Sequence, residues 1–160
     1  MKKIIFLVLI LIVSFTVIVG CKGKNVEKKP FTMICTTKKD KSKNIETQIV
    51  VTYNFNEEQL ATSYISKTTQ NFKNKKTYEA YKKEKEEIFN KNDSNTISYI
   101  LEPNDEKKIL KFTMEVRELN INAKSEKDIN TIKASTILKR NEKNGATCEI
   151  NGIRRKQIKD

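Results

Sequence analysis

The chain has no histidine and no tryptophan among its 160 residues. Without histidine it lacks the commonest general base and the commonest metal ligand, and a Ser-His or Cys-His nucleophile is impossible within one chain. Only four glycines are present, so a glycine-rich phosphate-binding loop is not expected. These absences predict a protein that is not an enzyme and that uses neither a cofactor nor a metal ion.

The carboxylates do not change this prediction. They gather in four clusters, which are Glu57-Glu58, Glu84/Glu86/Glu87, Asp105-Glu106 and Glu126/Asp128. None of these clusters has the spacing of a calcium-binding loop. Lysines surround the second cluster, which favours ion pairing on a helix over catalysis.

The first twenty-one residues indicate export. Two lysines precede an apolar run from Ile4 to Val19, whose sixteen residues fall short of the roughly 18 to 20 needed to span a bilayer. The run ends in Ile18-Val19-Gly20-Cys21, which resembles the bacterial lipobox. This resemblance implies that Cys21 receives a diacylglyceryl group and that cleavage before it leaves a lipidated N-terminus. The alternative is an uncleaved membrane anchor with an incidental cysteine, and in either case the rest of the chain lies outside the cytoplasm.

We therefore divide the chain into four parts: a lipoprotein signal peptide (1–20), a lipidated tether (21–30), one domain (31–150) and a basic C-terminal tail (151–160) that we expect to be frayed. The formal net charge of +12 falls to about +10 without the signal peptide. Such an excess favours anionic phospholipids or anionic envelope polymers as partners, through attraction that salt screens. No nucleic-acid-binding motif accompanies it, and the export signal argues against that partner.

Cys35 and Cys148 remain once Cys21 carries lipid. An even pair of cysteines in an exported domain is a candidate disulfide, and this one would enclose 114 residues. Two separate buried thiols are the alternative. Two thiolates without histidine make an incomplete zinc site, so we expect no metal there.

Alternating apolar residues predict five strands. They lie at Phe31–Thr36, Glu46–Phe55, Leu60–Lys67, Ile97–Leu101 and Leu110–Val116. The first three are expected to form a meander and the last two a hairpin, whose turn begins at Pro103.

Three helices are predicted. The longest covers 76–90, with Tyr78, Tyr81, Ile88 and Phe89 in one apolar stripe. A capping box at Ser125–Asp128 predicts a short helix to about Lys133, and another should run from Thr136 to Asn144 and stop at Gly145. The fold class is therefore α+β, an antiparallel sheet with helices on one face.

The layout resembles one known family. The lipobox, the early MICTT strand with its cysteine, the single long helix and the closing NGATCEI segment are similar to the small YehR-like lipoproteins of bacteria, a domain of unknown function. The resemblance implies an α+β fold and an envelope location, and it brings no catalytic residues.

Three functions remain compatible with these features. We favour a lipid-anchored, non-catalytic binding module on the extracytoplasmic face of the cell membrane, whose partner, such as a surface protein, meets the side of the sheet without helices. The alternative is a structural or stress-related envelope protein that acts through its basic charge on anionic polymers. An enzyme would need a lysine, tyrosine or carboxylate base, and a deep pocket holding a perturbed carboxylate and tyrosine would indicate one.

Overall fold

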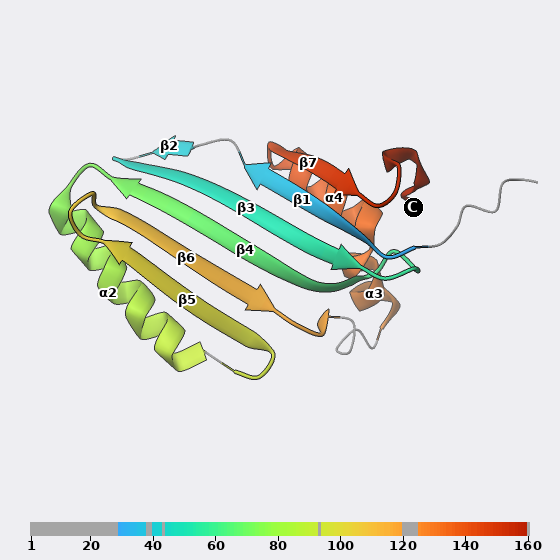
Figure 1. Ribbon diagram of the computed structural model, residues 1–160, viewed down its shortest axis with the longest axis horizontal. Coiled ribbons are helices and arrows are strands. Elements are labelled where there is room, and N and C mark those ends of the chain that lie inside the picture. The colour runs from blue at the N-terminus through green and yellow to red at the C-terminus, as the bar shows by residue number, and fades with distance from the viewer. Residues whose placement is uncertain (1–28, 38–39, 43, 93, 120–124, 160) are drawn as a thin grey trace, which may run out of the picture.

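The computed structural model describes residues 29–37, 40–42, 44–92, 94–119 and 125–159 (Figure 1). The expected signal peptide, the lipidation residue Cys21 and most of the tether lie outside these residues.

The described residues form an α+β domain, as predicted. The strands are β1 (Phe31–Thr37), β2 (Asp40–Ser42), β3 (Ile45–Phe55), β4 (Ala61–Phe72), β5 (Ile97–Asn104), β6 (Ile109–Val116) and β7 (Ala146–Asn151). The helices are α2 (Lys75–Asn92), α3 (Glu126–Ile132) and α4 (Ala134–Lys143), followed by the short 3-10 helix η2 (Arg155–Gln157). The capping box of α3 is present, and α4 ends before Gly145, which has a φ of 81°.

The strands make one antiparallel sheet in the order β5-β6-β4-β3-β1-β7, with β2 paired to β3. The predicted meander and hairpin are both present. Two strands, β2 and β7, were not predicted. The second of these lies at the sheet edge beside β1, and it carries Cys148.

α2 and α4 pack on one face of the sheet, which we call the helix-bearing face, and α3 lies against α4. Directly paired residues of adjacent strands point to the same side, and successive residues alternate sides. By this register Ile45, Tyr53 and Phe55 of β3 share a face, although the first packs near α2 and the others near α4. In Figure 1 α2 runs alongside β5, and the strands pass in front of α4.

The core is divided into two clusters on this face. The larger includes Phe31, Met33 and Phe55 under Ile137 and Leu138 of α4. The smaller joins Phe72 and Leu110 of the sheet to Tyr78 of α2. Their separation leaves the middle of the helix-bearing face without a helix among the described elements.

Two expectations about individual residues and one about the tail were wrong. Pro103 belongs to β5 and pairs with Leu110, and the turn follows it. Proline has no backbone N–H, and an edge strand tolerates it because the outward-facing positions of such a strand make no hydrogen bond within the sheet. Ile88 lies at the exposed margin of the stripe and is 38% exposed, since at 3.6 residues per turn it sits about 80° around the helix from the fully buried Tyr78.

The third concerns the tail, which packs against the domain instead of fraying. Ile153 and Ile158 contact the larger core cluster. The side chain of Gln59 donates to the carbonyl of Gln157 (2.8 Å) and accepts from the backbone N–H of Lys159 (2.9 Å).

Candidate functional site

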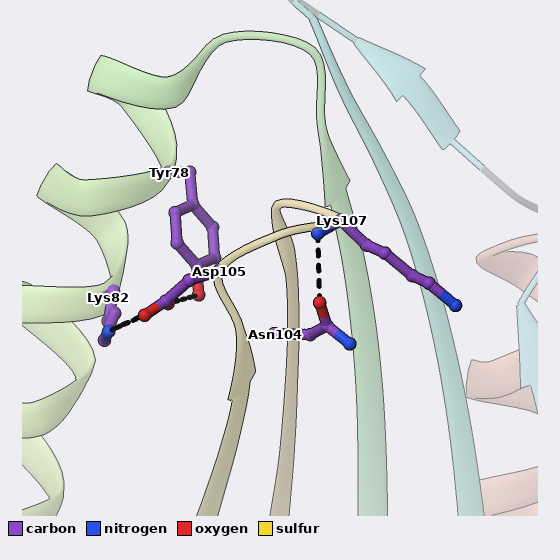
Figure 2. A network of polar contacts seen from close by, with 5 residues as sticks. All are labelled: Tyr78, Lys82, Asn104, Asp105 and Lys107. Atoms are coloured by element: carbon purple, nitrogen blue, oxygen red, sulfur yellow. Dashed lines mark hydrogen bonds and ion pairs between the residues drawn. The ribbon is translucent and has the colours of Figure 1, made fainter.

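A polar cluster joins α2 to the turn between β5 and β6 (Figure 2). The Tyr78 hydroxyl donates to Oδ1 of Asp105 at 2.5 Å. The Lys82 ammonium donates to both carboxylate oxygens of Asp105, at 2.9 and 3.1 Å. The sequence had placed Tyr78 in a packing stripe and Asp105 in a carboxylate cluster, without connecting them.

Local structure brings these three groups together. Tyr78 and Lys82 are four residues apart, so they lie on the same side of α2 one turn from each other. The turn that presents Asp105 is held by Asn104, whose side-chain oxygen accepts from the backbone N–H of Lys107 at 2.9 Å. Tyr78 is fully buried, and its ring meets Phe72 edge-on at 5.6 Å.

The contacts stabilise the ordinary charge states of all three groups. Burial and the hydrogen bond to Asp105 raise the pKa of Tyr78 far above its usual value. Hydrogen bonds from Tyr78 and Lys82 lower the pKa of Asp105, and the hydrogen bond to Asp105 raises the pKa of Lys82. At neutral pH the cluster is therefore a phenol, a carboxylate and an ammonium, and none of them is poised to take up a proton.

The surroundings also argue against catalysis at this cluster. The Asp105 side chain is 63% exposed at the tip of a hairpin, whereas the Tyr78 hydroxyl is turned away from solvent. An open depression of the described surface lies away from this pair, on α3 and the start of α4, lined by Glu126, Lys127, Asn130, Thr131 and Thr136. We interpret the cluster as a clasp that fixes α2 to the β5–β6 hairpin.

The predicted disulfide is present. Cys35 and Cys148 are bonded and face each other directly across β1 and β7, with their Cα atoms 4.1 Å apart. Both are buried in the larger core cluster. The alternative of two separate thiols is therefore excluded, and the bond fastens the last strand of the domain to the first.

Two further features are absent from the described part of the chain. None of its helices combines the length and the apolar character that a bilayer crossing needs. It also contains no group of three or more cysteines and carboxylates positioned to hold a metal ion.

The face of the sheet opposite α2 and α4, which we call the open face, is a second candidate surface. By the strand register it carries mainly hydroxyl, amide and β-branched side chains, among them Thr32, Ile34, Thr36, Gln48, Val50, Thr52, Asn54, Ser63, Ile65, Thr69, Ser98, Ile100 and Thr113. It also carries the charged residues Glu46, Lys67, Glu102, Lys111, Glu115 and Glu149. Most of the uncharged side chains are half-buried by their neighbours, whereas Ile100 is 59% exposed. Within the described residues, no helix packs on this face.

Comparison with known proteins identifies no relative. No protein-family model matches the chain, and neither does any curated protein or solved structure. The resemblance to the YehR-like lipoproteins therefore stays a prediction, which depends on the lipobox, the two cysteines and the element order.

Proposed function

We propose that this protein is a lipid-anchored, extracytoplasmic binding module without catalytic activity, and that a partner protein docks on its open face. The lipobox-like residues Ile18 to Cys21 support the anchor, and the buried disulfide fits an oxidising compartment. The clasp accounts for the perturbed tyrosine and carboxylate without an enzymatic role.

The open face is the observation on which the binding role depends. Both core clusters, the helices α2 and α4 and the disulfide use the other side of the sheet. The open face combines β-branched side chains with hydroxyl and amide groups that can exchange hydrogen bonds with a partner. Ile100 on the outer strand β5 is the most exposed large apolar side chain of the described domain.

Lipidation is tested by the intact mass of the full-length protein extracted from membranes of its own host. We expect the mass of the chain beginning at Cys21 plus a diacylglyceryl group, and disappearance of the lipidated form in Cys21→Ala. An unmodified Cys21 preceded by an intact leader would contradict the anchor.

Docking is tested with two matched substitutions of exposed isoleucines. Ile100→Glu places a charge on the open face, whereas Ile88→Glu makes the same change on α2, where the side chain is 38% exposed. In crosslinking on intact cells, we expect a surface protein captured by the parent and by Ile88→Glu to be lost from Ile100→Glu. Equal capture by both variants, or no capture by the parent, would contradict docking on this face.

A further inference from the structure

The helix-bearing face has a half-buried strip of its own in the gap between α2 and α4. We call it the tyrosine strip and define it by six side chains that share this face by register: Val51, Tyr64, Ser66, Met114, Val116 and Tyr99. They come from β3, β4, β6 and β5, which are four adjacent strands. Val51 and Tyr64 pack against the larger core cluster and Tyr99 stacks on Phe89 of α2, with ring centroids 4.6 Å apart, and all six side chains stay half-buried.

The sheet topology explains why the strip is left between the helices. α4 packs on β7 and α2 packs on β5, at opposite edges of the sheet (Figure 1). α2 also contacts β6 and β4, and the core cluster under α4 reaches Tyr53 and Phe55 of β3. The strip is therefore the narrow part of the sheet that lies between these two areas of contact.

Phenol and amide groups converge at the α4 side of this strip. The rings of Tyr53 and Tyr64 lie 5.8 Å apart, and Nδ2 of Asn141 reaches the Tyr53 hydroxyl at 3.4 Å. Burial raises the pKa of Tyr64, with Tyr53 and Tyr99 adding to the effect and Arg140 opposing it. Tyr64 thus shares its environment with two other phenols and one guanidinium.

The charge next to the strip on its α4 side is positive. No inward-facing position of β3, β5 or β6, or of β4 from Tyr64 onward, carries a charged residue. Arg140 of α4 is exposed and forms no ion pair with any described residue. On the opposite side Lys85 of α2 is engaged, since it lies 5.8 Å over the Phe112 ring and 3.6 Å from Glu84.

We propose that the tyrosine strip binds a single-chain anionic amphiphile, such as a fatty acid, with its headgroup at Arg140 and Tyr64 and its alkyl chain across Val51, Met114 and Val116. A carboxylate would give Arg140 the partner that it lacks among the described residues and could accept from the Tyr64 hydroxyl. The uncharged, apolar floor accepts a methylene chain without burying a charge. This inference does not depend on the lipid anchor or on the open face.

The test uses residues 22–160 as a soluble domain, because both core clusters and the disulfide lie between Phe31 and Ile158. Calorimetric titration with decanoate should show saturable binding. Arg140→Gln should weaken it about tenfold, as expected for the loss of one charge-assisted hydrogen bond. Lys143→Gln, which removes the same charge from an exposed residue one turn further along α4, should bind like the parent. Decanol should bind the parent and Arg140→Gln equally.

Two outcomes would overturn the inference. They are no saturable decanoate binding, and equal weakening of decanoate binding by Arg140→Gln and Lys143→Gln. Far-ultraviolet circular dichroism and the absence of free thiols would establish that each variant is folded.

Discussion

At the scale of single residues, the clasp of Tyr78, Lys82 and Asp105 shows how one carboxylate stabilises a whole interface. Tyr78 presents an apolar ring to the smaller core cluster and a polar hydroxyl that must be satisfied where the core ends. Asp105 satisfies it from a turn that is 27 residues away in the sequence. The contact links α2 to the hairpin that follows it.

The clasp predicts a defined pH dependence of stability. The pKa of Tyr78 is raised in the folded protein, so its contribution is complete below the unfolded value of about 10 and declines as pH rises further. The pKa of Asp105 is lowered, so its contribution is complete above the unfolded value of about 3.9 and declines as pH falls below it. The stabilisation from their hydrogen bond should therefore be greatest between these two pH values.

Tyr78→Phe removes this hydrogen bond and keeps the ring. We expect its free energy of unfolding to be lower than that of the parent by about 1 kcal/mol at pH 7. The difference should shrink below about pH 4 and above about pH 10, and urea denaturation of both proteins across the pH range measures it. Tyr81→Phe, on the same helix, serves as a control for the loss of a phenol outside the clasp. A pH-independent difference for Tyr78→Phe would contradict the linkage.

At the scale of the elements, local patterns predicted most strands and all three described helices. Val51, Tyr53 and Phe55 alternate clearly with polar residues because their strand has one covered face, and α3 shows its start through the Ser125 capping box. The strand β7 was missed because only Ala146, Cys148 and Ile150 alternate in it, directly after a helix stop. Six residues of this kind are also compatible with a loop, and only pairing with β1 decides the matter.

The candidate sites were less predictable because they depend on pairing between distant segments. The disulfide could be predicted, since a domain with two cysteines allows one pairing within the chain. The clasp, the open face and the tyrosine strip could not, because they depend on the register of six strands and on where α2 and α4 lie over the sheet. The sequence shows which residues alternate, but it does not show which rows of side chains become neighbours.

At the scale of the whole molecule, the disulfide connects the beginning of the domain to its end. Cys35 lies on β1, which has a strand on each side in the sheet. Cys148 lies on the edge strand β7, which is paired with β1 alone. The edge strand also leads into the tail that Gln59 holds against the core. The bond therefore secures the larger core cluster against separation of the C-terminal segment, which includes α4.

The size of this effect follows from the length of chain that the bond closes. The two cysteines are 113 residues apart, and in the chain-entropy account a loop of this length corresponds to about 4 to 5 kcal/mol.

We expect the double variant Cys35→Ala/Cys148→Ala of the soluble domain to unfold at a much lower urea concentration than the parent. The parent treated with a reductant that acts in urea should approach the variant, because the cross-link is then absent from both unfolded states. The variant itself should not respond to the reductant, which separates the cross-link from other effects. Since both cysteines are buried, the reductant should act on the folded parent only through unfolding. If the parent and the double variant unfolded at the same urea concentration, the two ends of the domain would be held by packing alone.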